Sequence, residues 1–171
     1  VAFGDNIGGF GYSEVNRKLW YVALNNGVFL YSKDGGISWT KSLWTGSKPR
    51  ANDQSYNYAK NQIVIKASEN DTNKVYYAGV GNFLLMSANG GKTFALKSTG
   101  LNVYRIRDFV VTPDDKFIFA ACGSAGAWIY SVDNNYWYQM YDSPVPTVDF
   151  TDVEFIKEKN IVRFATFGSG V

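Results

Sequence analysis

Histidine is absent from this chain of 171 residues, and cysteine occurs once, as Cys122. Without histidine, the Ser-His-Asp and Cys-His forms of nucleophilic catalysis are excluded, and the commonest metal ligand is missing. A single cysteine cannot form an intramolecular disulfide, and its apolar neighbours predict a buried small hydrophobic residue. We therefore expect no metal site and no cofactor.

The chain also lacks a strong net charge and any long apolar run. Its formal net charge is +2, without a basic run, which argues against a nucleic-acid partner. No stretch approaches about 18 consecutive apolar residues, so we expect no insertion into a membrane. The sequence starts at Val1 without a signal peptide, which predicts a processed or trimmed start.

Aromatic residues are plentiful, at 17% of the chain, and both packed β-sheets and sugar-binding grooves use such residues. An eight-residue motif recurs at residues 32–39 and 87–94, and in a weaker form at 131–138. The copies start 55 and then 44 residues apart, from 32 to 87 to 131. A period of this size indicates a repeat architecture.

The motif Ser-x-Asp-x-Gly-x-Ser/Thr-aromatic resembles the Asp-box (BNR) repeat of β-propellers, a family that includes sialidases, xyloglucanases and sortilin-like receptors. Residues 144–171 resemble the C-terminal end of its secreted members. The resemblance implies an all-β propeller with four-stranded antiparallel blades joined by Asp-box turns. With the glycosylation sequon that begins at Asn70, it also implies a secreted or extracellular protein.

The motif has a physical purpose in a tight turn. The Asp or Asn side chain accepts hydrogen bonds from backbone N–H groups, and the serine closes the loop with a further hydrogen bond. Glycine adopts a positive φ, and the aromatic ring packs beneath the turn. In the third copy Asn135 replaces glycine and Trp137 replaces Ser/Thr, so we expect a looser turn there. The residues assigned to these structural turns are Ser32, Asp34, Gly36, Trp39, Ser87, Asn89, Gly91, Phe94, Ser131 and Asp133.

Short β-rich runs separated by turn residues divide the chain into units of about 1–43, 60–98 and 104–141, with an incomplete unit at 147–171. This amounts to about three and a half blades, whereas propellers close with roughly four to eight. An open arc would leave strand edges exposed. We therefore expect the chain to be one part of a larger propeller, completed by another chain, another segment or a second copy.

The resemblance implies that the loops between blades share one face, where we expect binding. The longest such loop spans residues 44–59, and another enters the inner strand near residue 106. For the first, the alternative is a solvated insertion with its aromatic rings against the blade. For the second, with Arg107, the alternative is an ion pair within one blade. The candidate ligand-binding residues are Trp44, Arg50, Asp53, Tyr56, Tyr58, Tyr104, Arg105, Asp108 and Asp149.

Glycosidases need two carboxyl groups about 5–9 Å apart, and Asp108 and Asp149 are the pair that adjacent blades could supply. The sialidase set of an arginine triad, a tyrosine and a glutamate cannot be placed. Asn25-Asn26-Gly27 stands where a catalytic aspartate of the xyloglucan-cleaving members would be sought. We therefore predict a non-catalytic binding or structural module that recognises a glycan or a protein. The alternative is part of a propeller glycoside hydrolase acting on a polysaccharide.

Overall fold

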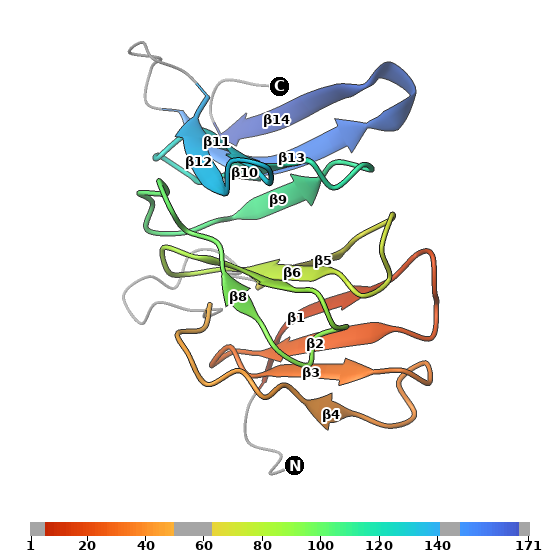
Figure 1. Ribbon diagram of the computed structural model, residues 1–171. Coiled ribbons are helices and arrows are strands. Elements are labelled where there is room, and N and C mark those ends of the chain that lie inside the picture. Colours follow the sequence, from red (N-terminus) through yellow and green to blue (C-terminus); the bar gives the residue numbers. More distant parts are fainter. Residues whose placement is uncertain (1–5, 50–62, 141–147, 168–171) are drawn as a thin grey trace.

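A computed structural model describes residues 6–49, 63–140 and 148–167 of the chain, and these are almost entirely strands. Each sheet is a meander of consecutive antiparallel strands (Figure 1). The first sheet holds β1 (Ile7–Tyr12), β2 (Trp20–Leu24), β3 (Phe29–Ser32) and β4 (Thr40–Lys41). The second holds β5 (Val64–Ala67), β6 (Val75–Ala78), β7 (Leu84–Ser87) and β8 (Ala95–Leu96). The third holds β9 (Asp108–Val111), β10 (Phe117–Ala121), β11 (Ala127–Ser131) and β12 (Tyr136–Gln139). The fourth holds β13 (Asp149–Ile156) and β14 (Ile161–Phe167), joined by the 3-10 turn Lys157–Lys159.

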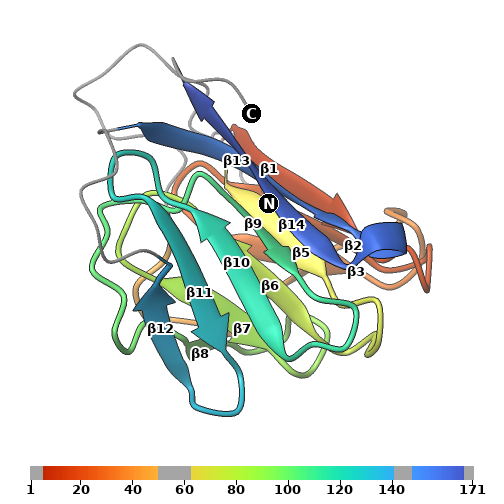
Figure 2. The same ribbon diagram turned by 90° about the horizontal axis from the view of Figure 1, so that it is seen from above.

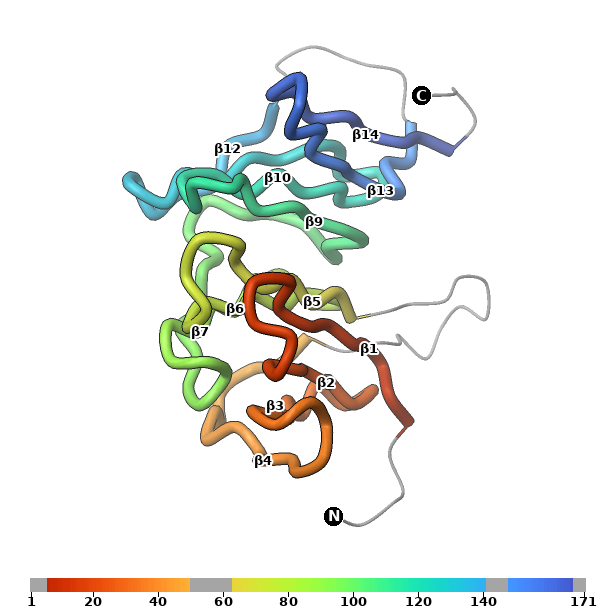
Figure 3. The backbone as a smooth tube through the Cα atoms, turned by 90° about the vertical axis from the view of Figure 1, so that its right-hand side faces the viewer, coloured from red at the N-terminus to blue at the C-terminus, as the bar shows by residue number. Residues whose placement is uncertain are grey.

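The four sheets are stacked as successive blades. Their first strands, β1, β5, β9 and β13, lie next to one another in a column (Figure 3). Seen from above, β1 and β13 lie on one side of the molecule and the outermost strands β8 and β12 on the other (Figure 2). This arrangement confirms the predicted all-β propeller architecture with about three and a half blades. No helix in the described ranges is long and apolar enough to cross a membrane.

Aromatic side chains fill the spaces between blades, because alternate residues of a strand point to opposite faces of its sheet. Between the first and second blades, the ring of Phe29 lies 4.9 Å from Tyr77 and 4.8 Å from Phe94. Between the second and third blades, the buried cluster includes Tyr76 and Trp137. Cys122 belongs to this second cluster and is 5% exposed, as predicted.

Strand β1 was not among the runs singled out in the sequence, because glycine is a poor strand former. Its glycines are needed where it meets the second blade. A Cβ atom on Gly9 would stand 2.0 Å from the carbonyl oxygen of Ile63, and one on Gly11 would stand 2.9 Å from the Ile65 side chain. The absence of side chains therefore lets two inner strands approach closely, and the Ile63 N–H donates to the Gly8 carbonyl at 2.8 Å.

The first two eight-residue turns share one hydrogen-bond pattern. In the first turn, the Ser32 hydroxyl donates to Asp34 Oδ1 at 2.7 Å and accepts the Gly36 N–H at 2.8 Å, and the Ser38 N–H donates to Asp34 Oδ1 at 2.9 Å. The second turn repeats these bonds with the residues Ser87, Asn89, Gly91 and Thr93.

The third turn differs from the first two in length and in hydrogen bonding. Ser131 pairs directly with Tyr136, so only residues 132–135 form the loop, whereas the first turn loops from 32 to 39 between Tyr31 and Thr40. Asn135 takes a left-handed conformation, with φ of 50°, as the sequence predicts. The exposed Asp133 side chain makes no hydrogen bond to another described residue, unlike Asp34 and Asn89 in the first two turns.

Candidate functional site

A cleft of about 710 Å³ runs across the inner strands of all four blades. Its walls come from the beginning of β1 and β5, from the segment that enters β9, and from β13. Its polar lining is built from Lys66, Arg105, Arg107, Asp108, Thr151 and Asp152.

At one end of the cleft, Arg107 of the third blade pairs with Asp149 of the fourth, with 2.6 Å between Nη2 and Oδ2. The position of this pair follows from the backbone. Gly123 and Phe150 exchange two backbone hydrogen bonds, of 2.9 and 3.1 Å, which hold β13 against the third blade. Gly123 has a φ of 65°, and a Cβ atom there would lie 3.0 Å from both Arg107 Nε and Asp149 Oδ1. Glycine at 123 therefore leaves room for the ion pair.

Asp108, which lines the cleft, contacts two other blades. Lys66 Nζ of the second blade lies 3.5 Å from Asp108 Oδ1, and the Val153 N–H of the fourth donates to Oδ2 at 3.2 Å. The carboxyl group of Asp152 also interacts with that of Asp108. Burial raises the pKa of Asp108 to about 6, against the opposing effects of Lys66 and the Val153 N–H, and the charge of Asp152 adds to the rise.

Arg105 lies at the entrance to β9 and also lines the cleft. Burial lowers the pKa of its guanidinium group, the neighbouring charge of Arg107 lowers it further, and Asp149 acts in the opposite direction. The cleft therefore concentrates charges of both signs in a partly desolvated space, where electrostatic interactions are stronger than in bulk water.

The structure brings together only some of the predicted site residues. Arg105 and Asp108 line the cleft, and Asp149 reaches it through Arg107. For Arg107 and Asp108 the alternative of an ion pair within one blade is wrong, since their ion pairs with Asp149 and Lys66 connect different blades. Arg50, Asp53, Tyr56 and Tyr58 lie outside the described residues.

Two other predicted residues do not line the cleft. Tyr104 is 63% exposed and stands outside the lining. Trp44 is half-buried against the core between the first two blades, and its Nε1 donates to the Ser47 carbonyl at 2.9 Å. For Trp44, the geometry therefore matches the alternative in which loop aromatics pack on the blade.

Sequence reasoning missed Lys66 and Phe10 as parts of the cleft, whereas it grouped Asp152 with Asp149 on the fourth inner strand. Lys66 had a detectable signal, because it is a charge inside the otherwise apolar run of β5. Asp152 follows an irregularity in the pairing of β13 with β14 between Phe150 and Asp152, which no sequence pattern announces.

This arrangement is better suited to recognising a polar ligand than to cleaving a glycoside with two of its own carboxyl groups, because these groups are already engaged by other residues. The carboxyl group of Asp108 is engaged by Lys66 and by the Val153 N–H. Asp149, in turn, is held by Arg107. The described residues contain no group of three or more His, Cys, Asp or Glu side chains that could hold a metal ion.

No protein-family model matches the sequence, and no curated protein sequence matches it. Solved structures do resemble the fold. The GH74 xyloglucanase from Xanthomonas campestris is 14% identical, with a TM-score of 0.72 over 93% of this chain and 26% of that chain. YCF48 bound to D1 peptide is 11% identical, with a TM-score of 0.58 over 95% and 48%. The computationally designed Ika4 protein is 9% identical, with a TM-score of 0.65 over 99% and 90%.

The xyloglucanase and YCF48 are propeller proteins, so these likenesses support the fold of the chain. At such low identity, these likenesses do not indicate that this chain shares the activity of either protein. The chain spans about a quarter of the xyloglucanase and about half of YCF48, which fits a propeller that needs further blades.

Proposed function

We propose that this chain is a non-catalytic binding module of a larger propeller, and that the cleft on its inner strands recognises a glycan or a protein segment. One observation carries the proposal. The charged groups of the cleft are fixed by contacts between different blades, so the free protein already presents them in a defined geometry. Such preorganisation lowers the entropic cost of binding a polar ligand.

The lining also offers both kinds of contact that a polar polymer needs. Arg107 and Lys66 can donate hydrogen bonds, Asp152 can accept them, and the half-exposed ring of Phe10 supplies an apolar surface beside them. A glycan or an extended peptide presents alternating hydroxyl or amide groups and apolar faces, which such a lining complements. The resemblance to a xyloglucanase and to a peptide-bound protein supports these two ligand classes.

A second candidate function is catalysis as part of a glycoside hydrolase, and one observation favours it. The pKa of Asp108 is raised to about 6 in an open cleft, which is the property required of a general acid. Asp108 would have to work with a second carboxylate on blades outside this chain, because Asp149 is paired with Arg107.

The proposal also covers the location of the protein, its blade boundaries and its partner blades. We place the protein outside the cell, where the sequon at the exposed Asn70, in the turn between β5 and β6, would be open to glycosylation. The unit boundaries near residues 43, 60, 98, 104, 141 and 147 would mark the blades. The remaining blades would be its obligatory partners.

Calorimetric titration of the purified chain tests the proposal, with soluble xyloglucan and a defined set of acidic, basic and neutral decapeptides as probes. Asp149→Asn breaks the Arg107 ion pair, and we expect it to weaken binding at least tenfold. Glu154→Gln is the matched control, since Glu154 lies on β13 like Asp149, pairs with Arg163 of β14 at 2.7 Å, and is outside the cleft lining. Equal effects of the two changes, or no binding of any probe, would reject the cleft as the binding site. Release of reducing ends from xyloglucan, lost in Asp108→Asn, would establish the catalytic alternative instead.

A further inference from the structure

Lys66 and Asp108 form the ion pair of the cleft that a ligand can replace most readily. Lys66 Nζ lies 3.5 Å from Asp108 Oδ1, whereas Arg107 Nη2 lies 2.6 Å from Asp149 Oδ2. The side chain of Lys66 is 41% exposed, and that of Asp108 is 15% exposed. The ammonium group of Lys66 is therefore held loosely by its partner and is accessible to a ligand in the cleft.

Charged groups face Asp108 from two of the three strands that contact β9. Strand β5 contributes Lys66 and β13 contributes Asp152, whereas β10 carries no charged residue. Strands β5 and β13 lie on opposite sides of β9 in the stack (Figure 1). The segment that enters β9 adds two arginines, and one of them pairs with a carboxylate of β13. The three cations of this set balance its three carboxylates only while Asp108 is ionised. The set is Lys66, Arg105, Arg107, Asp108, Asp149 and Asp152.

The charge of Asp108 changes in a range close to neutral pH. Burial raises the pKa of Asp108 to about 6, and the neighbouring Asp152 adds to the rise. The chain has no histidine, so no imidazole titrates in the same range. A protonated Asp108 keeps the hydrogen bond from the Val153 N–H, because its carbonyl oxygen still accepts. It no longer attracts Lys66, whose ammonium group is then available to an anion from outside the chain.

We propose that the cleft binds an acidic polypeptide segment, that a side-chain carboxylate of this segment replaces Asp108 as the partner of Lys66, and that Asp108 takes up a proton from the solvent when the segment binds. Apart from the new O–H bond of Asp108, no covalent bond forms or breaks. The inference rests on the proposed function of the cleft and adds to it a ligand class and a dependence on pH.

The other side of the cleft favours a peptide over a glycan. Ile7 and Phe10 of β1 line the same cleft and are 66% and 51% exposed. An extended segment that carries both acidic and apolar side chains complements these residues and the cations together. Its carboxylates form charge-assisted hydrogen bonds, which are stronger than those of neutral groups. A neutral glycan offers only hydroxyl groups and would leave the excess cation without a counter-charge.

Calorimetric titration with two decapeptides of equal apolar content, at pH 5.5 and pH 7.5, tests the inference. One peptide carries Asp and Glu residues, and the other carries Asn and Gln at the same positions. We expect the acidic peptide to bind wild type about tenfold more tightly at pH 5.5, because a ligand that prefers the protonated form pulls on its population. Titration in buffers of different ionisation enthalpy should show a net uptake of protons. The amide peptide should bind more weakly at pH 5.5 and without proton uptake.

Three variants assign the effect to named groups. Asp108→Asn carries no charge at either pH, so it should bind the acidic peptide at pH 7.5 as tightly as wild type does at pH 5.5, without proton uptake. Adding Lys66→Met to this variant should weaken that binding by about tenfold, and it leaves no buried carboxylate without its cation. Glu154→Gln removes a carboxylate outside the cleft lining and should keep the wild-type dependence on pH.

The outcomes separate this inference from the proposed function. Binding of the amide peptide or of xyloglucan as tightly as the acidic peptide would overturn the inference and leave the cleft as a binding site. Equal affinity of wild type for the acidic peptide at both pH values, or an unchanged dependence on pH in Asp108→Asn, would also overturn it. Tighter binding of oligogalacturonate than of the acidic peptide would assign the carboxylate to a glycan instead. No binding of any probe would reject the proposed function as well.

Discussion

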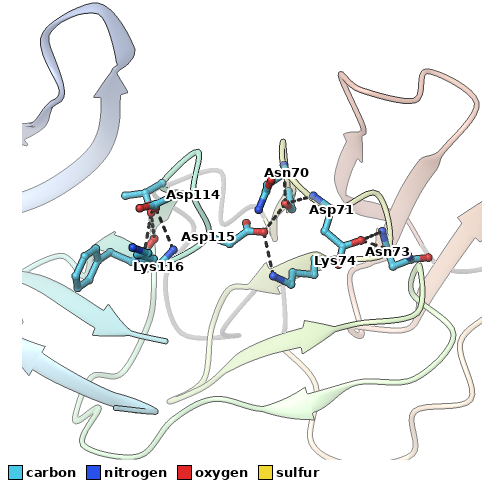
Figure 4. Close-up of polar contacts among 10 residues, drawn as sticks. Asn70, Asp71, Asn73, Lys74, Asp114, Asp115 and Lys116 are labelled. Atoms are coloured by element: carbon cyan, nitrogen blue, oxygen red, sulfur yellow. Dashed lines mark hydrogen bonds and ion pairs between the residues drawn. The ribbon is translucent and has the colours of Figure 1, made fainter. Parts of the chain in front are cut away.

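Lys74 of the second blade and Asp115 of the third form an ion pair, with 3.1 Å between Nζ and Oδ2, in which the Asp115 side chain is only 3% exposed (Figure 4). The Ser68 hydroxyl donates to the same oxygen at 2.8 Å. Asp115 reaches across from a turn where its own φ is 58°, a conformation that is unfavourable for a residue other than glycine. The contact therefore connects the first turns of two blades.

Replacing Lys74 with methionine should destabilise the chain by about 2–3 kcal/mol, because the buried Asp115 carboxylate would keep only Ser68 as a partner. Urea unfolding at pH 7 measures the loss. Lys157→Met is the matched control. Lys157 also bridges two blades, pairing with Glu69, but these side chains are 52% and 40% exposed, so we expect a change within about 0.5 kcal/mol. Equal losses would show that burial of Asp115 does not determine the strength of the contact.

The raised pKa of Asp108 predicts a stability that falls as pH rises. In the folded chain this pKa is about 6, above its ordinary value of 3.8, because burial penalises the charged form. The folded state thus holds the proton more tightly than the unfolded state does. The resulting stabilisation is complete below about pH 4 and is lost as pH rises through 6.

Asp108→Asn should remove this dependence, since asparagine does not titrate. The difference in unfolding free energy between wild type and variant, measured from pH 4 to 7, should change between pH 4 and 6 and stay level above. In Asp152→Asn, Asp108 keeps Lys66 and most of its burial, so the wild-type slope should largely remain. A difference that is the same at every pH would contradict the raised pKa.

The two matching turns predict opposite outcomes for two changes at Asp34. Hydrogen bonds from the Ser38 side chain, the Ser38 N–H and the Ser32 side chain lower the pKa of Asp34 to about 2. Its stabilising contribution is therefore present above about pH 4 and is lost as pH falls through 2. Asp34→Asn should fold normally at pH 7, because Asn89 accepts the equivalent N–H in the second turn, and should lose part of the acid sensitivity.

Asp34→Ala should instead lower the melting temperature at every pH, because no side chain then accepts the Ser38 N–H. Melting curves from pH 2 to 7 separate the three proteins. The same acid dependence in wild type and Asp34→Asn would mean that another group is responsible for it.

The sequence was enough to predict the blades but not the cleft. Strands such as β6 and β10 are runs of β-branched and aromatic residues bounded by turns, which a local pattern reveals. Strand β1 escaped notice because its glycines are set by contact with Ile63 and Ile65, more than fifty residues away.

The contacts within the cleft also could not be predicted from local sequence patterns. Lys66, Asp108 and Asp152 belong to three different blades, and their meeting depends on how the blades stack. The pairing irregularity that precedes Asp152 adds a shift that periodicity does not encode. Sequence reasoning could nominate Asp108 and Asp149 as charges on inner strands, but it could not assign their partners.

A glycine-to-alanine change can cost stability in two ways here: through the left-handed backbone conformation, and through a clash with the Arg107–Asp149 ion pair. Comparing Gly123 with Gly35 separates the two costs. Both have positive φ, at 65° and 74°. A Cβ atom on Gly35 would have nothing within 4 Å, whereas one on Gly123 would lie 3.0 Å from Arg107 Nε and Asp149 Oδ1. Gly35→Ala should therefore lose only the conformational cost, about 1–2 kcal/mol.

Gly123→Ala should lose about 1 kcal/mol more than Gly35→Ala, because the Arg107–Asp149 pair must also move to make room for the methyl group. Urea unfolding compares the two variants, and the double variant Gly123→Ala with Asp149→Asn isolates the contribution of the pair. If the extra loss arises from the pair, it should shrink when Asp149 no longer carries a charge. An extra loss that persists in the double variant would place the strain in the backbone bonds between Gly123 and Phe150 instead.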